Sequence, residues 1–160
     1  MPLPVFVYDA KTLNKITELY FPFEEAWGMT HNDTAIIVTT GGSNLYYLDP
    51  VTFKTIKTVG VYDNNGYVAN VNELEYLNGK LFANVYLTDK ILQIDPMTGN
   101  VLAVADLSNI LAQVGVKNDP KKIDAGNVLN GIAYNKQKGT FFITGKMWPV
   151  TIELKLNGIR

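Results

Sequence analysis

Polar side chains that could carry chemistry gather in one stretch of this chain, residues 72–89. The candidates among its polar residues are Asn72, Glu73, Glu75, Asn84 and Tyr86. Carboxylates in such a group can act as general bases and then as general acids. The surrounding β-forming residues and the Asn-Gly pair at 78–79 predict that the stretch is a β-hairpin. Polar groups in an otherwise apolar hairpin cost free energy unless they are paired or used, so this stretch is the first candidate for a site.

Strand signals dominate the rest of the chain, and these strands must position the hairpin. We predict strands at 5–8, 16–21, 26–30, 35–40, 45–48, 55–61, 73–77, 81–86, 91–94, 101–106, 131–134, 141–145 and 151–156. They fall into groups of two, four, four and three. One short helix is expected at 109–114, capped by Ser108. A polar loop is expected at 117–127.

An internal repeat supports this grouping. The sequence Leu-Asp-Pro-Val-Thr at 48–52 returns as Ile-Asp-Pro-Met-Thr at 94–98, and Tyr-Asp-Ala-Lys-Thr at 8–12 is a degenerate earlier copy. A four-stranded unit that repeats every forty-odd residues is typical of a β-propeller. We therefore predict an all-β fold, an incomplete β-propeller with about two whole four-stranded blades plus two partial blades, in a single domain over 1–160.

Incomplete blades leave strand edges and an apolar blade face unpaired, and such edges invite pairing with another chain. Three explanations stay open. The chain is part of a longer protein, or it assembles with a partner, including a second copy of itself, or it closes in an unusual way.

The composition excludes several classes of function. The chain has 160 residues and a formal net charge of −1, which argues against nucleic acid as a partner. It has no cysteine and one histidine, so thiolate and His-rich metal sites are excluded, and any Ser-His-Asp triad would need His31 as its base. We expect His31 in an exposed loop. No apolar run reaches membrane-spanning length, and the first residues do not read as a signal peptide.

Five segments resemble motifs of one family, in that family's order. The segment EAWGMT at 25–30 is similar to EGWGLT, NELEY at 72–76 is identical to its counterpart, and ANVYLTD at 83–89 is similar to ANVWQTD. The segments at 129–134 and 144–149 match LNGIAY and TGKxWP. The family is glutamine cyclotransferase, the plant and bacterial type of glutaminyl-peptide cyclotransferase.

The resemblance implies a five-bladed propeller that converts the N-terminal glutamine of a peptide to pyroglutamate. This acyltransferase releases ammonia and uses no cofactor and no catalytic metal. The implied partner is a peptide with an N-terminal glutamine. The family is commonly secreted, periplasmic or endomembrane, which is the only indication of localisation. The family's FTQG and FGEG motifs have no counterpart here, so the resemblance covers nearly all of this chain but only a carboxyl-terminal part of the family's sequence.

The resemblance also implies roles for individual residues. Trp27 falls on the Trp of EGWG, an aromatic wall of the substrate site. Asn72 falls on the first Asn of NELEY, an amide that holds the substrate. Lys146 falls on the Lys of GKxWP, which would bind or polarise the reacting carboxamide. Tyr86 replaces the Trp of ANVW, and its smaller ring with a hydroxyl is a departure from the family at this wall.

The reaction also needs a group that accepts a proton, and further side chains that exclude water from the substrate site. Asn72 and Lys146 suit the catalytic task of stabilising the developing oxyanion. Trp148 could help to exclude water, and Glu73 is a further substrate-binding candidate. The FGEG glutamate is the presumed proton shuttle of the family. The available carboxylates are Glu25, Glu73 and Glu75. Either Glu73 or Glu75, which lie on one face of a strand, could in principle replace the missing glutamate.

Each candidate also has a structural alternative. Trp27 could fill a blade interface, Asn72 and Glu73 could be turn residues at a blade entry, and Lys146 could be a solvated charge. Trp148 could be structural, because it precedes Pro149 at a turn. At the level of function, the alternative to an enzyme is a catalytically inactive propeller remnant that binds peptides or a protein partner.

Overall fold

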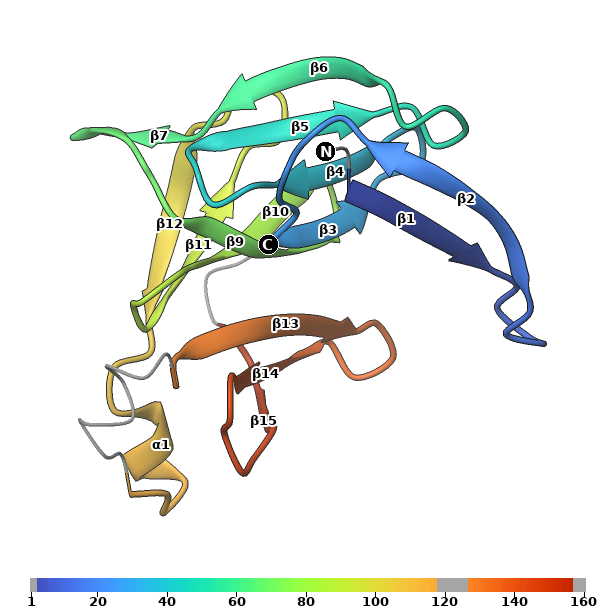
Figure 1. The fold of residues 1–160 in the computed structure, drawn as a ribbon. Helices are drawn as coiled ribbons and strands as arrows, with labels where there is room; N and C mark the ends of the chain where they lie inside the picture. The colour runs from blue at the N-terminus through green and yellow to red at the C-terminus, as the bar shows by residue number, and fades with distance from the viewer. Residues whose placement is uncertain (1–2, 118–126, 157–160) are drawn as a thin grey trace.

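The computed structural model describes residues 3–117 and 127–156, and this part of the chain is built almost entirely of strands (Figure 1). The elements are β1 (Leu3–Tyr8), β2 (Lys15–Phe21), β3 (Gly28–His31), β4 (Ile36–Thr39), β5 (Asn44–Leu48), β6 (Thr55–Gly60), β7 (Tyr62–Asp63), β8 (Gly66–Tyr67), β9 (Val71–Leu77), β10 (Lys80–Val85), β11 (Lys90–Ile94), β12 (Val101–Asp106), α1 (Ile110–Gln113), β13 (Leu129–Asn135), β14 (Thr140–Gly145) and β15 (Ile152–Leu154).

The strands form sheets in the predicted groups of two, four, four and three. The hairpin β1–β2 is followed by the antiparallel sheets β3–β4–β5–β6 and β9–β10–β11–β12, and then by β13–β14–β15. The two four-stranded sheets are whole blades and the other two are partial, so the prediction of an all-β, incomplete propeller is confirmed. A fifth sheet, the two-stranded pair β7–β8, was not predicted, because strands of two residues are too short to show a hydrophobic period.

Turn chemistry explains why the strands reverse where they do. Asn78 and Gly79 both have positive φ, 49° and 76°, which is the geometry of a type I′ hairpin turn. The repeated Asp residues at 9, 49 and 95 each accept a hydrogen bond from the backbone N–H of the Thr three residues later. These Asx-type turns join β1 to β2, β5 to β6 and β11 to β12. The hairpin β1–β2 therefore corresponds to the outer two strands of a blade, as the repeat predicts.

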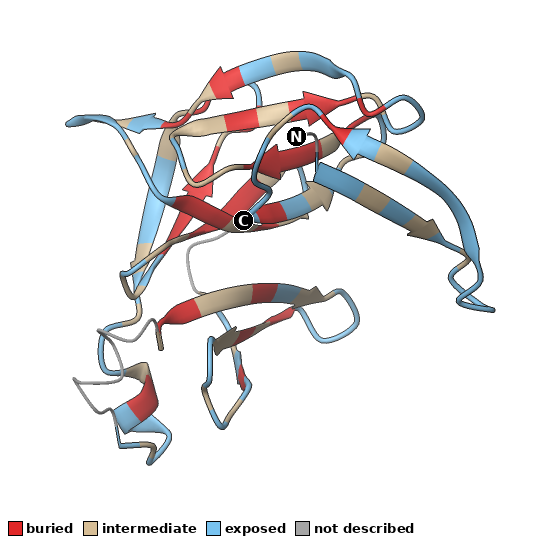
Figure 2. Ribbon diagram, in the orientation of Figure 1, coloured by how far each residue is buried: buried red, intermediate tan, exposed pale blue. Residues whose placement is uncertain are grey.

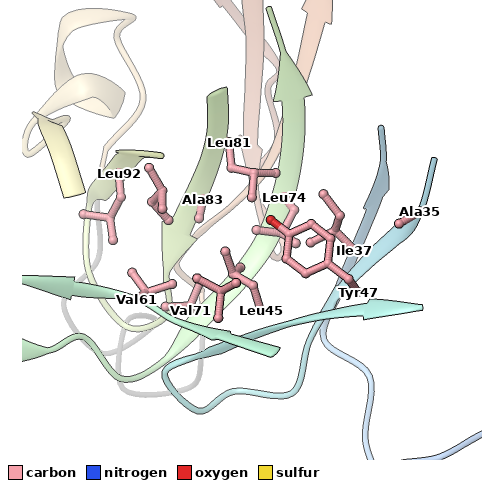
Figure 3. Close-up of a cluster of buried hydrophobic side chains, with 12 residues drawn as sticks. Ala35, Ile37, Leu45, Tyr47, Val61, Val71, Leu74, Leu81, Ala83 and Leu92 are labelled. Carbon is pink, nitrogen blue, oxygen red and sulfur yellow. The ribbon is translucent and has the colours of Figure 1, made fainter. Parts of the chain in front are cut away.

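The hydrophobic core lies between successive sheets. One cluster joins the two whole blades, with Ile37, Leu45 and Tyr47 facing Leu74 and Leu81 (Figure 3). A second cluster joins the blade β9–β12 to the sheet β13–β15, and a third joins the hairpin β1–β2 to the blade β3–β6. Burial is accordingly greatest along β4, β5, β9, β10 and β11, and much lower along β1 and β2 (Figure 2). Each sheet thus depends on its neighbours for most of its apolar contact.

Two smaller predictions have different outcomes. The helix exists but is only Ile110–Gln113, and the prediction that Ser108 caps it is wrong. Asn109 occupies the N-cap position in a left-handed conformation without a side-chain cap, and the Ser108 hydroxyl donates to the Asp106 carboxylate instead. His31 is exposed as expected, although it ends strand β3 rather than lying in a loop. Most of the loop predicted at 117–127 lies outside the described residues.

Within the described ranges, no helix has both the length and the apolar character needed to cross a membrane.

Candidate active site

Three strands lie side by side at the inner edges of successive sheets: β3, β9 and β13. Each is the first strand of its sheet, and β9 contacts both of the others. Side chains rather than backbone pairs join them. Thr39 Oγ1 accepts a hydrogen bond from Gly28 N–H and donates to the carbonyl of Asn72 (3.0 and 2.7 Å), and Thr30 Oγ1 accepts from Tyr76 N–H (3.2 Å). The start of β9 is therefore held firmly against the start of β3.

On the other side of β9, the two glutamates of NELEY bind the next inner strand. Glu73 accepts a hydrogen bond from Ile132 N–H (2.8 Å), and Glu75 accepts one from Tyr134 N–H (3.1 Å). The two hydrogen bonds are regularly spaced because the two glutamates on β9, like the two N–H donors on β13, are two residues apart along an extended strand. Two of the polar side chains of this hairpin thus join neighbouring sheets, a role that the sequence pattern alone did not predict.

Burial between the blades changes the acidity of both glutamates. Loss of solvent raises the pKa of Glu73 from 4.5 to about 7, with a smaller contribution from the nearby Glu75 carboxylate. The hydrogen bond from Ile132 N–H opposes this rise without cancelling it. The pKa of Glu75 is also raised, again chiefly by burial. Glu73 is therefore a carboxyl group that changes charge near neutral pH.

Glu73→Gln is expected to remove a pH dependence from the stability of the chain. Because the pKa is higher in the folded state, the folded chain binds the proton more tightly, and the free energy of unfolding falls as pH rises from about 4.5 to about 7. Glutamine keeps the acceptor for Ile132 N–H and cannot ionise, so the variant gains up to about 3 kcal/mol relative to the native chain above pH 7. Urea unfolding at pH 5 and pH 8 measures the difference.

Glu24→Gln, at an exposed position, is the matched control and is expected to leave the pH profile unchanged. An equal pH dependence in the Glu73→Gln variant and the native chain would contradict the assignment.

A pocket of about 430 Å³ opens at the N-terminal ends of the three inner strands. Its lining residues come from all three sheets or from the segments next to them; they are Glu25, Ala26, Trp27, Asn72, Tyr86, Asn130 and Lys146. Four of the six residues predicted for the site thus meet here, from positions far apart in the sequence.

One wall of the pocket is aromatic. The rings of Trp27 and Tyr86 meet edge to face, with centroids 5.4 Å apart. The indole N–H of Trp27 donates to the Glu25 carboxylate (2.8 Å), which fixes the ring and the carboxylate together. The ring also covers Gly41, where a Cβ atom would lie only 2.6 Å from the indole. Trp27 is 36% exposed, so its free surface is available to a ligand rather than lost in the core.

The pocket also contains hydrogen-bond donors. The Lys146 ammonium lies over the Tyr86 ring, 4.9 Å from its centroid, and the Lys146 backbone N–H is anchored on the carbonyl of Val128 (2.9 Å). Asn72 is only 4% exposed and lines the same pocket. An amide and an ammonium in one pocket can both donate to a developing oxyanion.

The structure places the other two predicted residues elsewhere. Glu73 does not line the pocket, because its carboxylate is turned toward Ile132 on β13. Trp148 is partly buried against the apolar cluster between the blade β9–β12 and the sheet β13–β15, and its ring lies against Gly145, where a Cβ atom would be 2.4 Å away. Neither side chain reaches the space between Trp27 and Lys146.

Three pocket residues, Glu25, Ala26 and Asn130, were not among the predicted site residues. Glu25 was considered only as a nearby carboxylate, and the structure adds its contact with Trp27. Asn130 lies in the LNGIAY segment, and nothing in its local pattern sets it apart from an ordinary strand residue. Its position beside Lys146 and Asn72 follows only from the packing of one sheet on the next.

Among residues 3–117 and 127–156, no group of three or more His, Cys, Asp or Glu side chains is arranged to hold a metal ion.

The fold and the pocket together define an all-β, propeller-type protein with a polar, aromatic-walled site at the head of its inner strands. The family model for glutamine cyclotransferase matches residues 4–156, and the chain belongs to this family.

Two relatives are similar along most of the chain. A glutaminyl-peptide cyclotransferase of Arabidopsis thaliana is 36% identical over 151 residues, which are 94% of this chain and 46% of the relative. The crystal structure of Myxococcus xanthus glutaminyl cyclase superposes with a TM-score of 0.77 at 31% identity, over 89% of this chain and 59% of that one. A chain of the mitotic checkpoint complex shares only the fold, with a TM-score of 0.52 at 14% identity over 95% of this chain and 42% of that one. The chain thus spans about half the length of the curated relative it matches.

Proposed function

We propose that this chain carries the substrate site of a glutaminyl-peptide cyclotransferase, which converts the N-terminal glutamine of a peptide to pyroglutamate and releases ammonia. The observation that supports this most directly is the convergence of Trp27, Asn72, Tyr86 and Lys146 on one pocket. The names of its relatives agree with the same activity.

The reaction makes modest demands on the protein because the substrate supplies its own nucleophile. The α-amine attacks the carbon of the γ-carboxamide, which closes a five-membered ring, and the C–N bond to the leaving ammonia then breaks. Attack within one molecule makes positioning the largest contribution to the rate. A pocket that holds the glutamine side chain folded back toward its own α-amine is therefore sufficient for much of the catalysis.

Each wall of the pocket has a role in this scheme. Trp27 and Tyr86 pack against the glutamine side chain and exclude water from the reacting atoms. Lys146 and Asn72 donate hydrogen bonds to the carboxamide oxygen, which gains negative charge as the ring closes.

A carboxylate must also take the proton from the α-amine and return one to the leaving nitrogen. Of the three carboxylates considered from the sequence, only Glu25 lines the pocket, whereas Glu73 and Glu75 bind backbone N–H groups of β13. We assign the proton transfer within this chain to Glu25, which its hydrogen bond from Trp27 holds beside the aromatic wall.

Ammonia release by the purified chain tests the proposal. A peptide that begins with glutamine is expected to lose one ammonia, and a peptide of otherwise identical sequence that begins with asparagine is not, because it would have to close a four-membered ring. Product formation is followed by an enzyme-coupled ammonia assay and by mass spectrometry. Equal rates with and without the chain would refute the proposed activity.

A second candidate function is peptide binding without turnover, which the replacement of the family's Trp by Tyr86 favours. In that case the glutamine-initiated peptide binds, Trp27→Ala weakens the binding, and no product forms.

A further inference from the structure

Two turns beside the pocket hold large apolar residues in a strained backbone conformation. Leu87 has a φ of 64° and Met147 a φ of 60°, and the two residues are 57% and 81% exposed. This left-handed conformation is unfavourable for a bulky residue, because its Cβ atom approaches the following carbonyl oxygen. Neither backbone preference nor burial therefore explains why Leu and Met stand at these positions.

The two residues occupy the same place in successive sheets. The turn after β10 closes with a hydrogen bond from Thr88 N–H to the Val85 carbonyl (3.1 Å). The turn after β14 closes in the same way, from Trp148 N–H to the Gly145 carbonyl (3.1 Å). Positive φ at the third residue alone gives both turns type II geometry, which favours Gly or Asn at that residue. In the blade β3–β6, the corresponding residue after β4 is Gly41, with a φ of 80°.

Other left-handed positions show what is usual in this chain. Elsewhere among the described residues they carry Gly or Asn, apart from Leu13 and Phe53. Phe53 is buried in the cluster that joins the hairpin β1–β2 to the blade β3–β6, so packing accounts for it. Leu13 is 75% exposed in the turn between β1 and β2, which contributes no residue to the pocket. Strain and exposure therefore do not mark a site by themselves, and position must distinguish Leu87 and Met147 from Leu13.

Leu87 and Met147 each follow directly on a residue that lines the pocket. Tyr86 precedes Leu87, Lys146 precedes Met147, and the Lys146 ammonium lies 4.9 Å from the centroid of the Tyr86 ring. Since consecutive Cα atoms are about 3.8 Å apart, both turns belong to the rim of the pocket. The indole of the aromatic wall covers the corresponding glycine of the third sheet. Each of the three sheets thus contributes an apolar, solvent-accessible side chain at this end of the molecule.

The chemistry of the two side chains limits what they can recognise. Neither carries a charge or a hydrogen-bond donor, so each gains free energy mainly by burying apolar surface. A peptide whose first residue fills the pocket must extend its second residue across the rim. The side chain of that second residue is the first group outside the pocket that can make an apolar contact there. Strained positions of this kind cluster at ligand clamps in proteins.

We propose that Leu87 and Met147 form an apolar subsite for the side chain of the residue that follows the N-terminal glutamine. The chain then prefers peptides with an apolar second residue. This inference rests on the proposed function, which places the glutamine in the pocket. It adds a specificity-determining surface outside the groups that act on the carboxamide.

Binding measured apart from turnover tests the inference. The probes are two peptides that begin with Nα,Nα-dimethylglutamine, whose tertiary amine cannot form a stable lactam, and that differ only in a second residue of Leu or Asn. These two side chains have nearly the same size and shape. NMR titration is expected to show that the native chain binds the Leu peptide about tenfold more tightly, which corresponds to about 1.4 kcal/mol. In the double variant Leu87→Asn, Met147→Asn, the preference should fall below about threefold through weaker binding of the Leu peptide alone.

The substitutions also separate recognition from folding. Asn adopts the left-handed conformation more readily than Leu or Met, so the double variant is expected to unfold at the native temperature or above it. Leu13→Asn makes the same change at an exposed left-handed position away from the pocket, and it should leave the preference unchanged.

A preference that is absent from the native chain, or that the double variant retains, would overturn the inference. The ammonia assay decides the proposed activity separately. A chain without turnover can still show the preference, and a chain with turnover can lack it, so the two proposals can fail independently.

Discussion

Lys146→Met is expected to lower the rate of ammonia release from a glutamine-initiated peptide by about 10²–10³-fold, the loss typical of removing one donor to an oxyanion. Methionine keeps an unbranched, apolar side chain of similar length and removes the ammonium that lies over the Tyr86 ring. The effect should fall mainly on kcat, because the carboxamide oxygen carries most charge in the transition state rather than in the bound substrate.

The stability of this variant should be nearly native. Lys146 is exposed, and its ammonium forms no ion pair within the described part of the chain. Surface changes of this kind usually alter the free energy of unfolding by about 0.5 kcal/mol or less. A catalytic defect without a stability defect therefore separates a role in the reaction from a role in the fold.

Lys54→Met is the matched control, since Lys54 is an exposed lysine that does not line the pocket. Its turnover should be native. If Lys146→Met retained native kcat, or changed only KM, the assignment of Lys146 to the oxyanion would be wrong.

Gly28→Ala is expected to destabilise the chain by about 3 kcal/mol or more, which would lower Tm by about 6–12 °C for a domain of this size. A Cβ atom at this position would lie 2.2 Å from the carbonyl oxygen of Asn72 and 2.8 Å from Glu73 Cα. Both are backbone atoms, so no side-chain rotation can relieve the overlap. β3 and β9 would have to separate at the point where Thr39 joins them.

The same movement would displace Asn72 from the pocket, so peptide binding should weaken together with stability. Gly42→Ala is the control, because a Cβ atom there has no other atom within 4 Å. Thermal unfolding followed by circular dichroism compares the two variants. Equal Tm values for Gly28→Ala and Gly42→Ala would show that the close approach of β3 and β9 does not constrain the fold.

The blades themselves could be predicted because the signals that specify them are local. Alternating apolar residues mark the strands, and the Asn-Gly pair at 78–79 and the Asp residues at 49 and 95 fix the turns through their own backbone contacts. The period of the repeat then groups the strands into blades. The unpredicted pair β7–β8 and the uncapped helix α1 lie where these signals are short or ambiguous.

The family motifs, read residue by residue, supplied Trp27, Asn72, Tyr86 and Lys146, and their meeting in one pocket depends on neighbouring sheets packing in sequence order. The packing of the blades paired the Glu73 carboxylate with the backbone of β13 and placed Trp148, partly buried, against the apolar cluster between the last two sheets. It also brought Asn130 and Glu25 to the pocket. These outcomes depend on contacts between strands distant in the chain. A residue's own neighbours in sequence carry no information about which N–H or carbonyl of another blade it will meet.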